Sequence, residues 1–278
     1  MKIDLKEKSL SLKEALNQAK EGDILYLEDK EYKEKIIIDK PNLTLLGQPN
    51  TKITYGASHG TILPAELGGD GKKTFGTTGS ATCTVKPSAS GFKAVSIQFE
   101  NSFKRNQESG GQAVAFKSEC NNITLRNCKF LSHQDTLYID EGKGNIVQDC
   151  YIEGDIDFIF GSADCLFLNC QIHAIQEERQ IAYYTAPSTL KRNEQGFEFR
   201  GCHFTADRGM ELSIGRAWFP GGAKEPLHPR LKLVNCTLLE KTSLGLKRMH
   251  RDNPTNYVFT IEDCRLEQEE YDEEEAKG

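Results

Sequence analysis

The chain has 278 residues, of which 37% are hydrophobic and 27% charged, and this balance excludes general disorder. A net charge of −6 without a basic run argues against a nucleic-acid partner. Apolar residues never run together over about 18 positions, so we expect no membrane partner. The first residues lack the apolar core of a signal peptide, which indicates a cytoplasmic protein, or a secreted one if a leader was removed.

The first predicted element is a short helix that begins after Ser11. Ser11 and Glu14 form a possible capping box, and four apolar residues between positions 12 and 19 share one face. We expect this helix to cap the open end of the fold formed by the rest of the chain. Residues 55–83 are rich in Gly and Thr and are predicted to form a loop with short strands, not a domain boundary.

Six of the nine cysteines follow one template, with Asn, Asp or Gly immediately before and apolar residues three before and two after. They are Cys128, Cys150, Cys170, Cys202, Cys236 and Cys264. Their intervals of 22, 20, 32, 34 and 28 residues indicate a unit of 20 to 22 residues with loops inserted later. The short runs between them are rich in Val, Ile and Phe and show almost no helical period. This pattern predicts an all-β solenoid, the parallel β-helix.

In such a coil, like residues stack about 4.8 Å apart on successive turns. The cysteines would then form an interior ladder of small, reduced side chains, with a metal or disulfide role as the alternative. Asn or Asp before Cys suits a bend, because both tolerate left-handed backbone. We expect a single domain over residues 1–278, ending in an acidic tail at about 267–278 that is either an interaction segment or a solvated terminus.

The candidate chemistry occupies one phase of consecutive turns. Asp135 and Asp157 each lie seven residues after a ladder cysteine, and Gln112 and Gln134 are likewise 22 residues apart. The coil therefore gathers two carboxylates and two amides into one patch, which is either an active site or a ladder of surface polar residues. Arg216, in "GRAW", is a candidate cation for the same patch.

Two carboxylates about 5 Å apart repel each other by roughly 3 kcal/mol at an effective dielectric constant near 20, or about two pKa units. One of them is therefore expected to hold its proton. An ionised nucleophile or base beside a protonated acid is what hydrolysis of an ester or glycoside needs. The amides can donate hydrogen bonds to a developing oxyanion.

The segments "GGQAVAF", "HQDTLY", "YIEGDIDFIFG" and "GRAW" resemble the four signature segments of pectin methylesterases, carbohydrate esterases that demethylate galacturonan. Connecting segments such as "LTLLG", "GTTGSATCTV" and "TAPST" match in order over about residues 9–218, and "TAPST" is more like the bacterial branch. The resemblance implies a right-handed parallel β-helix and an aspartyl esterase that uses neither a metal nor a cofactor.

The resemblance also implies a role for each polar residue of the patch. Asp157 would attack the methyl-ester carbonyl and form an acyl-enzyme anhydride. Asp135 would protonate the departing methanol and then activate the hydrolytic water. Gln112 and Gln134 would form the oxyanion hole, and Arg216 would hold the nucleophile ionised and aimed.

The expected partner is methyl-esterified galacturonan or oligogalacturonide, bound to a monomeric enzyme. Trp218, Phe160 and Tyr138 match aromatic positions that contact the sugar chain, and Thr77 and Thr78 match a substrate-lining loop.

Beyond residue 218 the resemblance fades. The family's "GRPW" is "GRAW" in this chain, and an alanine in place of the proline frees a backbone that proline would fix.

Several neighbouring residues have a functional and a structural interpretation. His133 is expected to line the substrate groove and not to act as a base, and Glu177 either marks a calcium site or belongs to a solvated loop. Tyr183 either stacks on sugar or packs within a strand, and the same choice applies to Tyr184. In "YIEGDIDFIFG", we expect Glu153 to make a structural hydrogen bond or an ion pair and Asp155 to face solvent.

Three other functions remain open on the sequence. The first is glycan cleavage by a β-helix hydrolase or lyase, although an inverting hydrolase needs its carboxyls roughly 6.5 to 9.5 Å apart, wider than one coil rise. The second is a non-catalytic carbohydrate-binding or structural solenoid. The third is an esterase or thioesterase that acts on another acyl substrate.

Overall fold

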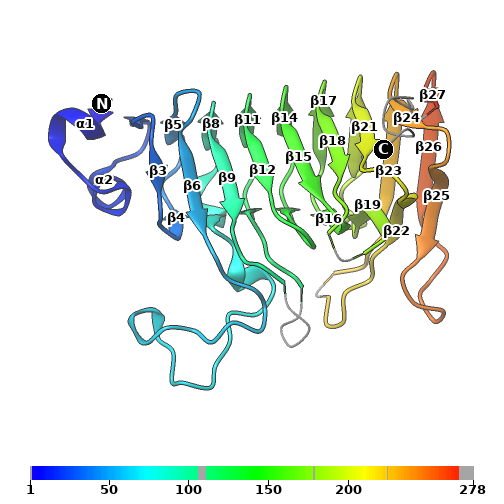
Figure 1. Cartoon of the computed structure of the whole chain (residues 1–278), viewed down its shortest axis with the longest axis horizontal. Helices are drawn as coiled ribbons and strands as arrows, with labels where there is room; N and C mark the ends of the chain where they lie inside the picture. Colours follow the sequence, from blue (N-terminus) through cyan, green and yellow to red (C-terminus); the bar gives the residue numbers. More distant parts are fainter. Residues whose placement is uncertain (1, 106–110, 178, 224, 269–278) are drawn as a thin grey trace, which may run out of the picture.

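The computed structural model describes residues 2–105, 111–177, 179–223 and 225–268. Within them, 27 strands form three sheets, and every pairing between these strands is parallel. Each turn of the chain adds one strand to each sheet, so the turns stack along the long axis of the molecule in Figure 1. This arrangement confirms the parallel β-helix.

One sheet has ten strands: β1 (Lys2–Asp4), β2 (Ile24–Tyr26), β5 (Thr44–Leu46), β8 (Lys93–Val95), β11 (Thr124–Arg126), β14 (Asn145–Gln148), β17 (Cys165–Leu168), β20 (Phe197–Arg200), β23 (Arg230–Val234) and β26 (Val258–Glu262). The second has nine: β3 (Glu31–Tyr32), β6 (Lys52–Tyr55), β9 (Gln98–Asn101), β12 (Lys129–Leu131), β15 (Tyr151–Gly154), β18 (Gln171–Ala174), β21 (His203–Ala206), β24 (Thr237–Leu239) and β27 (Arg265–Glu267). The third has eight: β4 (Ile36–Ile38), β7 (Cys83–Val85), β10 (Phe116–Ser118), β13 (Leu137–Ile139), β16 (Ile156–Gly161), β19 (Ile181–Pro187), β22 (Glu211–Ala217) and β25 (Ser243–Arg248).

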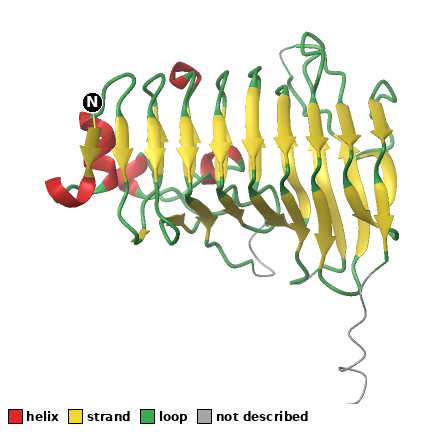
Figure 2. Ribbon diagram, turned by 90° about the horizontal axis from the view of Figure 1, so that it is seen from above, coloured by secondary structure: helices red, strands yellow, loops and turns green. Residues whose placement is uncertain are grey.

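Two α-helices, α1 (Leu5–Lys8) and α2 (Leu12–Gln18), lie at the N-terminal end of the coil (Figure 2). The capping box is confirmed, because Ser11 N–H donates to Glu14 Oε2 over 2.8 Å and Glu14 N–H donates to Ser11 Oγ over 3.2 Å. Leu12 and Ala15 are buried in the same core as the first strands. The amphipathic helix therefore covers apolar surface that the first turn would otherwise expose.

Three short 3₁₀ helices lie between the strands of the first half: η1 (Ala65–Leu67), η2 (Thr78–Ser80) and η3 (Pro87–Ala89). Two of them belong to the long connection between β6 and β7, which projects from the coil as the predicted loop (Figure 1). In the described part of the chain, no helix is long and apolar enough to span a membrane.

The interior is a stack of apolar side chains held in register by the parallel pairing. Phe99 of β9 pairs with Phe130 of β12, and their rings stack with centroids 5.6 Å apart and planes 6° apart. Ile152 of β15 continues the same column. Because each turn buries its apolar face only against its neighbours, the column is stable as an array and not turn by turn.

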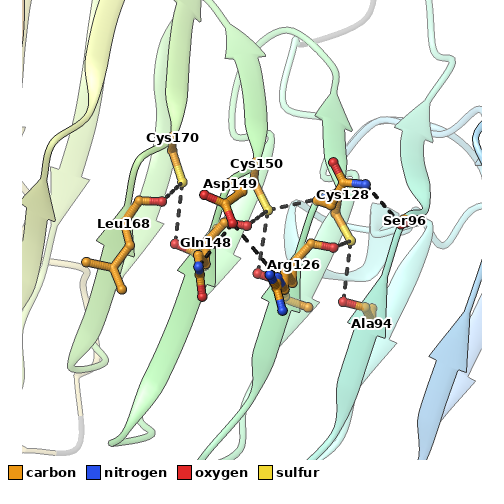
Figure 3. Close-up of polar contacts among 12 residues, drawn as sticks. Ala94, Ser96, Arg126, Cys128, Gln148, Asp149, Cys150, Leu168 and Cys170 are labelled. Carbon is orange, nitrogen blue, oxygen red and sulfur yellow. Dashed lines mark hydrogen bonds and ion pairs between the residues drawn. The ribbon is translucent and has the colours of Figure 1, made fainter.

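The six template cysteines form the predicted ladder, of which Figure 3 shows three members. Cys128 N–H donates to Cys150 Sγ over 3.4 Å, and Cys150 Sγ lies 3.1 Å from the carbonyl oxygen of Gln148. All nine cysteines are free, and only Cys264 on the last turn is not fully buried.

The residue before each ladder cysteine adopts left-handed backbone, as predicted for a bend. These residues are Asn127, Asp149, Asn169, Gly201, Asn235 and Asp263, with φ between 50° and 62°. Residues 269–278 of the expected acidic tail lie outside the described residues, whereas Glu267 ends β27.

Candidate active site

Asp135 and Asp157 lie on neighbouring turns at the face of the eight-stranded sheet. Asp135 lies two residues before β13, and Asp157 lies within β16. The Asp135 N–H donates to the Ile156 carbonyl oxygen over 3.2 Å. Both aspartates adopt left-handed backbone, with φ of 67° and 52°. Non-glycine residues rarely adopt this conformation, and it concentrates at functional sites.

The two amides lie on the adjoining turns, as the 22-residue spacing predicts. Gln112 and Gln134 pair in an isolated parallel bridge, which places them on neighbouring turns of the coil. A straight strand would turn Gln134 and Asp135 to opposite faces. The left-handed φ of Asp135 breaks that alternation, and this bend is the feature that the sequence did not reveal.

Arg216 of β22 lies two turns beyond β16 along the coil and holds Asp157. Its Nε donates to Asp157 Oδ1 over 3.0 Å and its Nη2 donates to Asp157 Oδ2, which makes the pair bidentate. The Arg216 guanidinium carbon lies 4.3 Å from the ring centroid of Tyr183. This cation–π contact and the fork geometry together fix the carboxylate in one orientation.

The two aspartates have different electrostatic surroundings. Burial raises the pKa of Asp135 well above its usual range, and the negative charges of Asp157 and Asp155 raise it further. Burial also raises the pKa of Asp157, but the hydrogen bond and positive charge of Arg216 oppose that effect. Asp135 is therefore the carboxyl that keeps its proton, and Asp157 is the one that ionises first.

The raised pKa of Asp135 predicts a pH-dependent effect of Asp135→Asn on stability. The protonated carboxyl is the form that the folded state favours. Its stabilising contribution is therefore complete below the unfolded pKa, about 3.9, and is lost as the pH rises through the folded pKa. An asparagine stays neutral at every pH. We expect the melting temperature of the variant, relative to that of the parent, to rise as the pH increases from 4 to 8. Calorimetry measures both temperatures. A difference in melting temperature that does not change with pH would contradict the raised pKa of Asp135.

Three aromatic side chains that match sugar-contacting positions form one cluster, hereafter the aromatic cluster, of Tyr138, Phe160 and Trp218. The Tyr138 and Phe160 rings stack with centroids 4.4 Å apart, and the Trp218 ring lies 5.7 Å from that of Phe160. Tyr138 and Phe160 are buried, whereas Trp218 is partly exposed. The cluster is separate from the coil interior and lies on the same sheet as the aspartates.

Thr77 and Thr78 begin the η2 turn, and both are half-buried. Ser80 Oγ donates to the Thr77 carbonyl oxygen over 2.6 Å and accepts from the Val114 N–H over 3.0 Å. Val114 packs with the aromatic cluster. This turn is therefore fastened beside the cluster and the segment that carries Gln112.

The expectation that Asp155 faces solvent is wrong. Its side chain is only 3% exposed, and Arg105 pairs with it through Nη1 to Oδ2 over 2.7 Å and Nη2 to Oδ1 over 3.3 Å. Asp155 Oδ1 also accepts from the Ile156 N–H over 2.6 Å. The partner lies 50 residues away in a long connection, so the alternation along the strand gave no signal of it.

Two of the structural interpretations are confirmed. The Tyr151 hydroxyl donates to the Glu153 carboxylate over 2.9 Å, which is the structural hydrogen bond expected there. Tyr184 is fully buried and donates to the Thr205 carbonyl oxygen over 2.9 Å, so it packs within the strand. Tyr183 instead faces Arg216. Alternation along the strand does not identify Arg216 as its partner in advance.

Glu177 contacts His133, the residue before Gln134. The Glu177 Oε2 atom is 3.4 Å from His133 Nδ1. Among the described residues, no group of three or more His, Cys, Asp or Glu side chains is placed to hold a metal ion. The next described residue of that loop, Arg179, donates from Nη1 to Gln134 Oε1 over 3.1 Å, and sequence reasoning missed this contact.

The alanine of "GRAW" does not release its neighbours. Ala217 is buried, ends β22 and pairs in register with Arg248 of β25. The Trp218 N–H donates to the Pro187 carbonyl oxygen over 2.9 Å. Strand pairing therefore restrains the backbone that proline would otherwise fix.

Comparison with known proteins shows that this chain is similar to pectinesterases. Probable pectinesterase 50 of Arabidopsis thaliana is 36% identical over 193 residues, which cover 67% of this chain and 48% of that protein. This chain thus spans about half the length of that relative.

Two solved structures share the fold. A pectin methylesterase from Yersinia enterocolitica superposes with a TM-score of 0.79 at 24% identity, covering 95% of this chain and 92% of that one. A pectin methylesterase in complex with a hexasaccharide superposes with a TM-score of 0.81 at 22% identity, covering 98% and 90%. The model of the pectinesterase family matches residues 4–218, which end at the tryptophan where the resemblance was expected to fade. The chain belongs to the pectinesterase family.

Proposed function

We propose that the protein hydrolyses methyl esters of galacturonan or methylated oligogalacturonides and releases methanol. The observation that carries this proposal is the pairing of two buried carboxyls with opposite tasks. Arg216 holds Asp157 by two hydrogen bonds, while Asp135 on the preceding turn has a pKa raised well above its usual range by burial. One carboxylate is thus fit for attack and one carboxylic acid for proton donation.

In the first half of the reaction, a carboxylate oxygen of Asp157 attacks the carbonyl carbon of the methyl ester. The oxyanion that forms accepts hydrogen bonds from the side-chain amides of Gln112 and Gln134. The bond to the methoxy group breaks as Asp135 gives its proton to that oxygen, and methanol leaves. The galacturonyl group stays on Asp157 as a mixed anhydride.

In the second half, Asp135 is a carboxylate and acts as the base. It takes a proton from a water molecule, whose oxygen attacks the galacturonyl carbonyl carbon. The anhydride bond breaks, Asp157 leaves as a carboxylate beside Arg216, and the product departs as a galacturonic acid that gives its remaining proton to the solvent. Each aspartate then has the protonation state with which it began.

The aromatic cluster supports a sugar chain as the substrate. Trp218 is its partly exposed member, and the apolar faces of pyranose rings pack against aromatic rings of this kind. We assign Trp218 to direct contact with a sugar ring. We assign Phe160 and Tyr138, which are buried, to holding the tryptophan in place, and Thr77 and Thr78 to the edge of the same surface.

This proposal predicts a bell-shaped pH dependence of kcat/KM for methanol release. Asp157 must be ionised to attack, so activity falls as the pH drops through its pKa, which burial raises against the effect of Arg216. Asp135 must be protonated to release methanol, so activity also falls as the pH rises through its higher pKa. Initial rates on a methylated oligogalacturonide from pH 4 to 10 test this. A profile with no alkaline limb would remove Asp135 as the acid.

The experiment that tests the function compares methyl, acetyl and thioester substrates side by side with the wild-type protein. Methanol from methylated galacturonan or its oligomers, without new reducing ends or unsaturated products, is the expected result. New chain ends would instead establish a glycan hydrolase or lyase. Turnover confined to an acetyl ester or a thioester would show that the protein is an esterase or thioesterase that acts on another acyl substrate.

We further propose that the enzyme works as a monomer in the cytoplasm. The five polar side chains of the site all come from one chain, so no second copy is needed to complete it. Nine free cysteines suit a reducing compartment. Light scattering should give a mass near 31.2 kDa, and cell fractionation should place the protein with cytoplasmic markers.

A further inference from the structure

The loop between β18 and β19 is attached to the site at successive points. The Gln176 N–H donates to Asp207 Oδ2 over 2.7 Å, which anchors the start of the loop. The Glu177 carboxylate lies 3.4 Å from the His133 ring, and Arg179 Nη1 lies 3.1 Å from Gln134 Oε1. The loop therefore contacts two consecutive residues of the turn that carries the catalytic patch.

The contact between Arg179 and Gln134 has a defined polarity. A guanidinium group can only donate hydrogen bonds, so the atom of the amide that faces it must be the oxygen. The amide group of Gln134 consequently turns its NH₂ away from Arg179. Without such a partner, a glutamine amide can rotate by a half turn and present its oxygen where its nitrogen was. An oxygen facing an oxyanion would repel it.

The same contact strengthens the donor. A cation bound to the carbonyl oxygen of an amide draws electron density from its nitrogen, and hydrogen bonds in such chains reinforce one another. The positive charge of Arg179 also favours the carboxylate forms of Asp135 and Asp157, although each is affected more strongly by Arg216. Arg179 is partly buried, which limits the screening of its charge by water.

We propose that Arg179 is a positioning residue that fixes the Gln134 amide with its N–H groups toward the oxyanion and makes that amide a stronger donor. The proposal rests on the proposed function for its effect on rate. It does not rest on it for the contact, which can be observed without turnover. Arg179 itself does not touch the reacting atoms.

The kinetic test compares Arg179→Met with Arg179→Lys on the substrate that the wild-type protein hydrolyses. Loss of a whole oxyanion donor costs about 10²- to 10³-fold in kcat, so loss of its orientation should cost about 10- to 100-fold with KM nearly unchanged. Lysine can still donate to the amide oxygen and should recover part of the rate. Arg126→Met, which removes an exposed arginine of the ten-stranded sheet, should have no effect.

A double-mutant cycle separates positioning from other roles. In a Gln134→Ala background the amide is absent, so Arg179→Met should have little further effect on kcat when each variant is measured at its own optimal pH, where the effect of the Arg179 charge on the two aspartates is removed. Additive losses would overturn the proposal. A rise in KM that grows with the number of free carboxylates in the substrate would also overturn it, because Arg179 would then bind the substrate directly.

The contact itself is tested by NMR of the side-chain amide groups, with the Gln134 signal identified by its absence in Gln134→Ala. Arg179→Met should shift that NH₂ signal, and Arg179→Lys should shift it less. An unchanged signal would overturn the proposal even if the enzyme is active. If the wild-type protein releases no methanol, the proposed function fails, and this measurement still decides whether Arg179 holds the amide.

Discussion

Asp157→Asn should lower methanol release from methylated oligogalacturonide by about 10⁴-fold or more, because the attacking group is removed without a change in shape. An asparagine side chain still accepts one hydrogen bond from Arg216 through its oxygen, so the local packing survives. Its amide nitrogen cannot form the mixed anhydride. The variant should therefore fold with the circular dichroism spectrum of the parent and bind substrate while failing to turn it over.

The matched control for this substitution is Asp149→Asn. Asp149 has the same left-handed backbone, with φ of 53° against 52° for Asp157, but lies at a bend of the cysteine ladder. Asparagine already occupies the equivalent bend at position 127, so the control should retain full activity. Methanol release by Asp157→Asn above a few per cent of the parent rate would rule out the covalent role of this carboxylate.

The coil and its bends were predictable because they repeat. The template around Cys128 recurs on later turns, and the Asn or Asp before each ladder cysteine has the left-handed backbone for which its side chain is suited. The same periodicity placed Asp135 beneath Asp157. Parallel pairing places residues at a constant sequence spacing next to each other, so the proximity of Asp135 and Asp157 can be predicted from their spacing.

The contacts that were not predictable arise where the repeat is interrupted. Asp155 and Asp157 are two residues apart, and strict alternation would place both on one face. The left-handed φ of Asp157 and the irregular register that follows Ile156 break the alternation within β16. The side chains then receive different arginines, Arg105 for Asp155 and Arg216 for Asp157. Those arginines lie in a long connection and on a later turn, whose loop lengths follow no period.

The three aspartates at positions 135, 155 and 157 therefore differ in the arginine that each one contacts. Arg216 favours the charged form of Asp157, and Arg105 neutralises the buried Asp155 carboxylate two residues before it. Asp135 receives no arginine hydrogen bond among the described residues, and its pKa rises. This unequal distribution of arginines separates the pKa values of the two aspartates more effectively than their spacing alone, and the proposed mechanism needs that separation.

Arg105→Met should lower the free energy of unfolding by about 3–5 kcal/mol, because it leaves the Asp155 carboxylate buried without its cation. The two side chains are 6% and 3% exposed, so water cannot replace the lost hydrogen bonds. The uncompensated charge would also raise the pKa of both Asp135 and Asp157, since Asp155 already acts on each in that direction. The acid limb of the activity profile should accordingly move to higher pH.

Two further variants identify the buried charge as the cause. Asp155→Asn added to Arg105→Met removes the unpaired charge while its amide oxygen can still accept the Ile156 N–H, so the double variant should be more stable than the single one. Arg192→Met breaks an ion pair with Glu225 whose side chains are 45% and 46% exposed, and it should cost less than about 1 kcal/mol. Urea unfolding of the four proteins measures both comparisons. Equal losses for Arg105→Met and Arg192→Met would show that burial does not set the strength of the Arg105 pair, and a double variant no more stable than Arg105→Met would show that the guanidinium stabilises the coil by packing and not by charge.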